Sequence, residues 1–186
     1  MEEIEFIFDT TKESMDNSIE HLKKELQKIS TGKANPAMLE GLMVDYYGSP
    51  TPLNRVSNIS ISDAKTLVIQ PWEKTMLAPI EQAIFKANMG VTPQNDGEIV
   101  RIIIPPLTQD RRKQLVKNAK ALVEDTKVSL RNARRDAISE IKQAVKDGLS
   151  EDIGKDKEKE IDEITKKYGN KSEELLKVKE KDIMTI

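Results

Sequence analysis

One uninterrupted helical run constrains the fold of this chain more than any other feature. Residues 107–148 contain no proline, and apolar or small residues recur there at steps of three and four. This spacing is typical of a helix that buries one narrow seam, as in a coiled coil. Thr108 stands where an N-cap is expected, and Gly148 is suited to end the helix. The predicted seam consists of Leu115, Ala119, Leu122, Thr126, Leu130, Ala133, Ala137, Ile141 and Ala144.

The length of this helical run indicates the kind of domain to which it belongs. At about 1.5 Å per residue, a helix over residues 107–148 would span roughly 60 Å. A small globular core cannot surround a rod of that length. We therefore predict that the run is one member of a long helical bundle.

The same run carries its basic residues on one face. With about 100° between successive residues, eight cations fall in the sector from about −60° to +40° around Lys113, whereas the seam is centred near about 230°. Only Glu124 interrupts this sector, although a solvated helix surface usually mixes both signs to gain i,i+4 pairs. The segregation favours a face that binds an anion over an ordinary solvated surface. The eight cations are Lys113, Lys117, Lys120, Lys127, Arg131, Arg134, Arg135 and Lys142.

The distribution of charge along the chain supports an anion-binding face more strongly than the net charge does. The formal net charge is only -2, so the bulk charge argues neither for nor against a nucleic-acid partner. Residues 107–148, however, carry 11 Lys and Arg against 6 Asp and Glu, whereas acids exceed bases in the rest of the chain. The positive excess is therefore local to the central helix, where it can attract phosphates.

Several classes of function have no residues to support them. There are no cysteines, and His21 is the only histidine, so neither a thiolate site nor a paired histidine metal site is expected. No glycine-rich phosphate loop or nucleophile elbow is present. We expect a protein that is not an enzyme and needs no metal or cofactor. The acidic N-terminus and the lack of a long apolar run favour a cytoplasmic protein without membrane contact, expected to be a monomer.

Two further segments with helical periodicity lie on either side of a region with a different sequence pattern. Residues 2–30 and 151–184 repeat the helical spacing, whereas residues 31–105 alternate short apolar runs with proline and glycine. We predict an α+β protein: a long antiparallel three-helix bundle formed by residues 1–30 and 106–186, with a small β/α/β domain inserted at 31–105. A hinge is predicted near residues 30–33 and 104–106, at Thr31, Gly32, Ile104, Pro105 and Pro106.

Local patterns also predict the details of these segments. In the insert we expect strands over residues 38–47, 56–61, 66–70 and 98–104, a turn or edge connector at 49–52 and a helix over 77–88. In the helix expected over residues 151–184, two glycines should weaken the apolar seam slightly. We expect the charged faces of this helix to be solvated. The seam predicted there is Ile153, Ile161, Ile164, Tyr168, Leu175, Val178 and Ile183.

Several ordered blocks of the sequence resemble the bacterial ribosome recycling factor family. Residues 105–108 (PPLT), 111–113 (RRK) and 128–137 (VSLRNARRDA) resemble its signature. Residues 31–36 (TGKANP), 46–53 (YYGSPTPL) and 70–74 (QPWEK) match further blocks in the same order. The resemblance covers essentially the whole chain.

The resemblance implies both a shape and a function. It implies an L-shaped molecule with a hinge between the bundle and the inserted domain. It also implies a translation factor that binds the post-termination ribosome and, with elongation factor G and GTP, splits the subunits. The bundle of the family lies against large-subunit ribosomal RNA, and its smaller domain meets elongation factor G.

Together, the charge pattern and the resemblance define a candidate set for ribosomal RNA binding. Guanidinium forks on the central helix can grip phosphates in a bidentate way. Lys33 keeps the charge of the arginine that is usual in the family at that position, and it joins the set. The candidates are Arg131, Arg134, Arg135, Lys127, Lys120, Lys117, Lys113, Arg112 and Lys33. The alternative function is a helical adaptor or chaperone-like scaffold that binds a protein partner through its helix surfaces.

Overall fold

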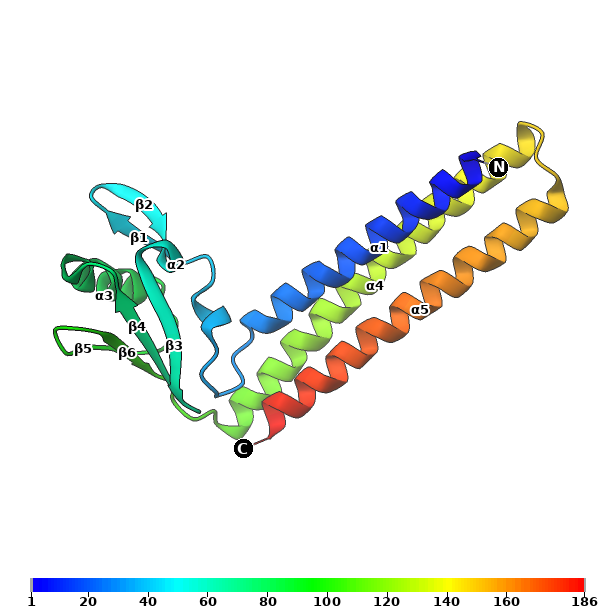
Figure 1. Ribbon diagram of the computed structural model, residues 1–186. Coiled ribbons are helices and arrows are strands. Elements are labelled where there is room, and N and C mark those ends of the chain that lie inside the picture. Colours follow the sequence, from blue (N-terminus) through cyan, green and yellow to red (C-terminus); the bar gives the residue numbers. More distant parts are fainter. Residues whose placement is uncertain (1, 186) are drawn as a thin grey trace. The chain divides into compact units, whose positions relative to one another are not determined.

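A computed structural model describes residues 2–185, and it confirms the predicted α+β class of long helices with a small β domain (Figure 1). The chain divides into two compact units. The first unit holds the chain up to Leu26 and from Lys113 onward, and the second is Gln27–Arg112. The helices of the first unit are α1 (Glu2–Lys28), α4 (Gln109–Lys146) and α5 (Glu151–Met184).

The central helix α4 begins and ends where its sequence predicts. The Thr108 hydroxyl accepts a hydrogen bond from the backbone N–H of Arg111 at 3.1 Å, as an N-cap does. At the other end Gly148 adopts φ 117°, and the N–H of Leu149 donates to the carbonyl of Ala144 at 3.0 Å. A positive φ is accessible to glycine at little cost, so Gly148 closes the helix and turns the chain toward α5.

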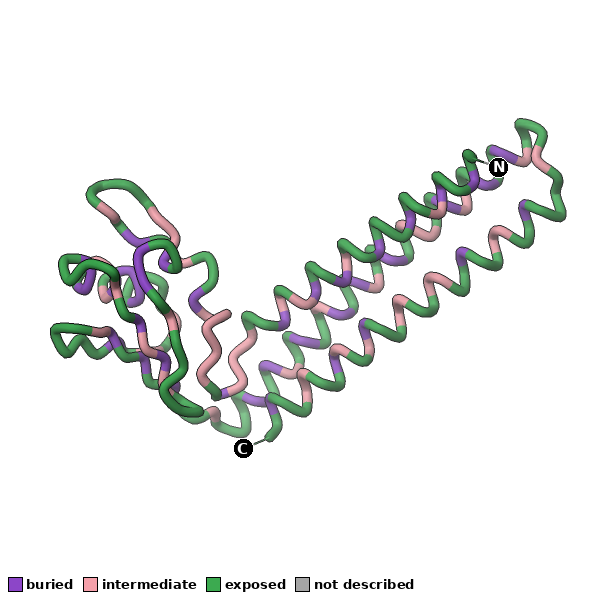
Figure 2. Tube along the Cα trace, viewed as in Figure 1, coloured by how far each residue is buried: buried purple, intermediate pink, exposed green. Residues whose placement is uncertain are grey.

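The three long helices lie side by side, with α4 antiparallel to both α1 and α5 (Figure 1). Buried positions recur along each of them at helical spacing (Figure 2). At one end Ile4 and Ile7 of α1 pack with Ala137 and Ile141 of α4 and with Ile161 of α5. The burial of this shared seam holds the bundle together, because it removes apolar surface from water.

The seam of α5 differs from the one predicted. Val178 is 61% exposed and Ile153 is 41% exposed, whereas Gly154 and Ser172 are buried. The Ser172 hydroxyl donates to the carbonyl of Gly169 at 2.7 Å, so its burial leaves no unsatisfied donor. At Gly154 a small residue is required because a Cβ there would meet Val145 of α4. A pattern based on apolar residues alone does not predict small residues at buried positions.

A tyrosine joins α5 to α1. The Tyr168 hydroxyl donates to Oδ1 of Asp16 at 2.7 Å. Partial burial of the ring, together with this hydrogen bond to a carboxylate, raises the pKa of Tyr168 to about 12. The phenol therefore stays protonated and keeps its donor across the physiological pH range.

The second unit is built on a four-stranded antiparallel sheet of order β3-β4-β6-β5. Along its central strands Leu67, Ile69, Val100 and Ile102 are buried, and they share a core with Ile80 of helix α3. A separate two-stranded sheet joins β1 to β2. The elements are η1 (Pro36–Leu39), β1 (Met43–Tyr46), β2 (Ser49–Pro52), α2 (Leu53–Val56), β3 (Ser57–Asp63), β4 (Thr66–Pro71), η2 (Lys74–Met76), α3 (Leu77–Lys86), β5 (Pro93–Asn95) and β6 (Val100–Ile103).

Some of these elements correct the sequence-based expectations. The strand expected over residues 38–47 is a short 3-10 helix, η1, followed by the shorter strand β1. The segment expected as a turn or connector is strand β2, which pairs with β1 despite Pro50 and Pro52. Proline is tolerated there because β2 lies at the edge of its sheet. Strand β5 and helix α2 were not expected, since each is only three or four residues long.

The chain passes from one compact unit to the other between Leu26 and Gln27 and between Arg112 and Lys113. The domain limits expected from sequence, at residues 30/31 and 105/106, stay a prediction. The last turn of α1 and the first turn of α4 thus group with the second unit. Within residues 2–185, none of the helices is both long and apolar enough to cross a lipid bilayer.

The close contact between Gly154 of α5 and Val145 of α4 yields the first prediction. A Cβ added at Gly154 would lie 2.5 Å from Cγ2 of Val145, a β-branched side chain that cannot easily turn away. We expect Gly154→Ala to lower the free energy of unfolding by about 1–3 kcal/mol. Urea unfolding followed by circular dichroism measures the change.

The matched control is Gly169→Ala in the same helix. Nothing lies within 4 Å of a Cβ at Gly169, so the substitution should raise the stability by about 0.5–1 kcal/mol through helix propensity alone. A Gly154→Ala variant as stable as Gly169→Ala would contradict the packing described here.

Candidate nucleic-acid interface

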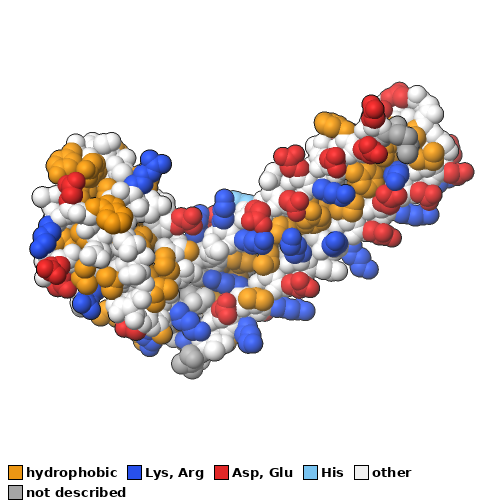
Figure 3. Space-filling model, in the orientation of Figure 1, with side chains coloured by type: hydrophobic (Ala, Val, Ile, Leu, Met, Phe, Trp, Pro, Cys, Tyr) orange, Lys and Arg blue, Asp and Glu red, His pale blue; other side chains and the backbone are white. Residues whose placement is uncertain are grey.

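Burial of the α4 seam decides which way its cations face. Leu115, Ala119, Leu130 and Ile141 are buried, so the opposite side of the helix is left to the solvent. Figure 3 shows Lys and Arg side chains together with acidic ones along the visible face of the bundle. The exposed cations of the α4 row are Lys113, Lys117, Lys120, Arg131, Arg135 and Lys142, and Lys127 and Arg134 are partly buried.

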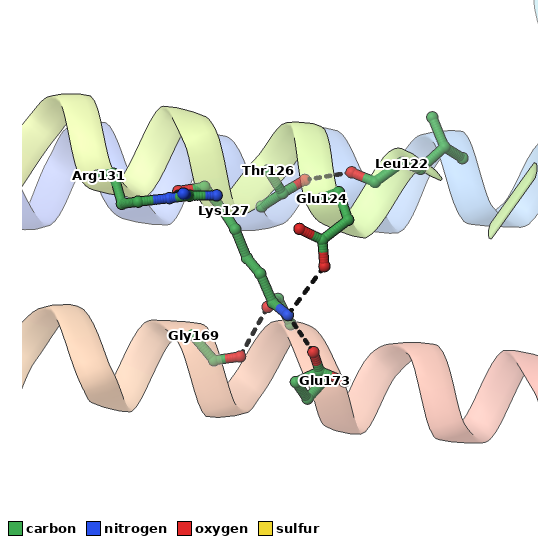
Figure 4. Close-up of polar contacts among 8 residues, drawn as sticks. Leu122, Glu124, Thr126, Lys127, Arg131, Gly169 and Glu173 are labelled. Atoms are coloured by element: carbon green, nitrogen blue, oxygen red, sulfur yellow. Dashed lines mark hydrogen bonds and ion pairs between the residues drawn. The ribbon is translucent and has the colours of Figure 1, made fainter. Parts of the chain in front are cut away.

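Three cations of the row form ion pairs with carboxylates of α5. Lys120 Nζ lies 3.4 Å from Oε1 of Glu180, and Arg134 Nε donates to Oδ1 of Asp162 at 2.5 Å. Between them, Lys127 bridges Glu173 of α5 and Glu124 of its own helix (Figure 4).

The unpaired cations form the other flank of the row. Within residues 2–185, no carboxylate forms an ion pair with Lys113, Lys117, Arg131 or Lys142. The Arg131 Nε donates instead to the backbone carbonyl of Lys127 at 3.3 Å. Arg135 Nε lies 3.8 Å from Oδ1 of the neighbouring Asp136, which is too long for a hydrogen bond.

Helical geometry explains this division. Measured around α4 from Lys113, the α5-paired cations Lys120, Lys127 and Arg134 lie at about −20° to −60°, toward the seam. The remaining cations of the row lie at about 0° to 40°, farther from the seam. The first flank therefore faces α5, and the second flank presents its charges to the solvent, where they are available to a phosphate.

The sequence does not predict the acidic partners on α5, because the mixed charges of this helix are typical of a solvated surface. The spacing of these acidic residues along α5 nevertheless indicates that they share one side of the helix. Asp162, Glu173 and Glu180 are 11 and 7 residues apart, which brings them within about 20° on one side of α5. The sequence does not reveal that this side lies beside the cations of α4, because that depends on how the two helices are aligned.

The ion pairs keep their cations charged. The hydrogen bonds that Lys127 donates to Glu173 and then to Glu124 raise its pKa, although partial burial opposes them. The hydrogen bond that Arg134 donates to Asp162 raises the pKa of Arg134 in the same way. Both side chains therefore stay cationic at any pH at which the protein would meet a polyanion.

Arg112 does not belong with the exposed row. It is 6% exposed, so its guanidinium is not presented to the solvent as the candidate set requires. The reason is its place on the helix: at about 260° from Lys113 it lies near the centre of the buried seam. We remove Arg112 from the phosphate-binding set.

The remaining predicted residues lie in the second unit. Lys33 is exposed and follows Gly32, which is buried and has φ 76°. Ile104 is 2% exposed in the core of that unit, and its N–H donates to the carbonyl of Lys65 at 2.7 Å. A hinge at Thr31, Gly32, Ile104, Pro105 and Pro106 stays a prediction.

Comparisons with known proteins agree with one another. A family model described as ribosome recycling factor matches residues 22–184. The ribosome-recycling factor of Flavobacterium johnsoniae is 52% identical over 185 residues, covering 100% of this chain and 99% of that protein. The ribosome-recycling factor of Christiangramia forsetii is 50% identical over 186 residues and is covered completely, as is this chain.

Solved structures show the same similarity. The solution structure of a ribosome recycling factor has a TM-score of 0.81 at 33% identity, with 100% of both chains covered. A second structure describes the T. thermophilus ribosome recycling factor and the E. coli elongation factor G bound to the E. coli post-termination complex. That factor has a TM-score of 0.67 at 39% identity, with 98% of this chain and 99% of that chain covered.

The bridging position of Lys127 generates a prediction about stability. We expect Lys127→Met, which keeps the apolar stem, to lower the free energy of unfolding by about 0.5–1 kcal/mol at low salt. At about 1 M salt the loss should largely vanish, because screening weakens the ion pairs. Urea unfolding at both salt concentrations provides the measurement.

Lys117→Met serves as the control, since Lys117 lies in the same row and has no ion pair with a described carboxylate. It should change the stability little at either salt concentration. An equal loss for Lys127→Met at low and high salt would mean that packing, rather than charge, holds this side chain.

Proposed function

The chain belongs to the ribosome recycling factor family, and on that premise we propose that it binds the post-termination ribosome and, with elongation factor G and GTP, separates the ribosomal subunits. The bundle docks on ribosomal RNA, and the protein acts in the cytoplasm, where the ribosomes are. Its contribution is mechanical, because it binds the ribosome and helps to move the subunits apart. It catalyses no covalent step itself.

The observation that carries the docking surface is the exposed flank of α4. Lys113, Lys117, Arg131, Arg135 and Lys142 lie in one row on a helix whose opposite side is buried. A row of cations on a rigid rod suits the sugar–phosphate backbone, which offers regularly spaced anions. Because the row holds cations without interleaved aromatic side chains, we expect binding directed by backbone and shape rather than by base sequence.

The links between the units complete the proposal. Gly32 stands at φ 76°, a conformation that L-residues rarely adopt, whereas Pro105 and Pro106 restrict the chain at the other crossing. We propose that movement at these crossings lets elongation factor G act on the second unit while the bundle stays on the RNA. Lys33, at the first crossing, is retained as a candidate contact.

A subunit-splitting assay tests the function directly. Purified post-termination ribosomes, elongation factor G and GTP are followed by light scattering with and without this protein. We expect the scattering to fall only when the protein is present. Unchanged scattering at saturating protein would contradict the proposed function.

The same assay tests the docking surface through Arg131→Ala. Arg131 is exposed and makes no ion pair with a described carboxylate, so the fold should be kept. The variant should need a higher concentration for half-maximal splitting. In a binding titration against ribosomes, its log–log salt slope should fall by about 1 at most, as expected for one lost phosphate contact.

Lys166→Ala is the matched control, because Lys166 is an exposed cation of α5 outside the α4 row. It should bind and split as the wild type does. If Arg131→Ala behaves like Lys166→Ala at every salt concentration, the α4 row is not the docking surface.

A further inference from the structure

The contact between Arg134 and Asp162 leaves most of the guanidinium unused. Arg134 donates through Nε to Oδ1 of Asp162, and the two side chains remain 43% and 51% exposed. Within residues 2–185, neither Nη group of Arg134 forms a hydrogen bond. The guanidinium is therefore held at its inner nitrogen while its two terminal nitrogens keep their donors.

Arg131 is held in a related way. Its Nε donates to the backbone carbonyl of Lys127 at 3.3 Å, and its Nη groups likewise make no hydrogen bond within the described residues. Arg135, by contrast, has only a long contact of 3.8 Å with Asp136. Two of the three arginines in the row thus donate through Nε within the protein, one to a carboxylate of α5 and one to the backbone of α4.

A fixed guanidinium is suited to phosphate recognition. The two Nη groups can donate a pair of parallel hydrogen bonds to one phosphate, and the geometry of that fork is rigid. An arginine that is already oriented loses less rotamer freedom when the phosphate arrives. Against this, the Asp162 carboxylate offsets part of the positive charge and repels the phosphate. Orientation of the guanidinium should strengthen phosphate binding, whereas the negative charge of Asp162 should weaken it. Because the two effects on affinity have opposite signs, an experiment can separate them.

We propose that Asp162 is a positioning residue for phosphate recognition: it holds the Arg134 guanidinium through Nε so that the two Nη groups can grip a phosphate of the ribosomal RNA. This inference rests on the proposed function, since it takes the α4 row to be the docking surface. It assigns to α5 a part in RNA binding that its own charge would not suggest.

Two substitutions at one position separate orientation from charge. Asp162→Ala removes both the acceptor and the negative charge, whereas Asp162→Asn removes the charge and keeps an oxygen acceptor. Binding is measured by fluorescence anisotropy with labelled protein and purified large ribosomal subunits. We expect Asp162→Ala to weaken binding about twofold to tenfold, the usual effect of leaving one long side chain to be ordered on binding. Asp162→Asn should rescue the affinity.

A double-mutant cycle shows whether Asp162 acts through Arg134. In the Arg134→Ala background, Asp162→Ala should have no further effect, because there is no guanidinium left to orient. Glu163→Ala is the control, since Glu163 is the adjacent exposed acid of α5 and has no ion pair within the described residues. It should not weaken binding. Thermal unfolding of each variant reports on the fold.

The possible outcomes are distinct. If Asp162→Ala binds as tightly as the wild type or more tightly, Asp162 does not position Arg134 and the inference is overturned. A loss that persists in the Arg134→Ala background overturns it as well, because the effect then runs through the fold. If Arg134→Ala and Arg131→Ala both bind as the wild type does, the docking surface itself is wrong, and the proposed function fails at that step.

Discussion

Burial of one narrow seam on α4 organises the helical bundle and its charged surface. Ala119, Ala137 and Ala144 are small, and Gly154 of α5 is closely approached by Val145. Because buried side chains pack against specific neighbours, burial of this seam fixes the rotation of α4 about its axis. Once that rotation is fixed, every cation of the row has a determined direction.

The neighbouring helix then divides the row. Cations on the flank toward α5 are paired with its carboxylates, and cations on the far flank face the solvent. The pairs are partly exposed, so each contributes little to stability. Lys120–Glu180 differs from the others: Oε1 of Glu180 is buried and accepts no hydrogen bond, so Lys120 at 3.4 Å is its counter-charge. Diverting Lys120 to a phosphate would leave that oxygen unpaired.

The sequence predicts what is decided locally. The caps at Thr108 and Gly148 and the helical spacing placed α4 within two residues of its observed ends. The strand β2 was missed because its two prolines read as a turn, and Val178 was placed in the seam because periodicity does not show which rotation of α5 its neighbours select. The pairing of Asp162 with Arg134 joins residues 28 apart in different helices. Only the packing of the two helices brings them together.

Lysine reactivity can show whether the exposed flank of α4 lies against phosphates in the ribosome-bound state. The bound and free proteins are acetylated briefly, and modification at each lysine is quantified by mass spectrometry. Lys113, Lys117 and Lys142 should become protected on the ribosome, because their ammonium groups contact RNA. Equal acetylation of these three lysines in the free and bound states would contradict the proposal that this flank binds RNA.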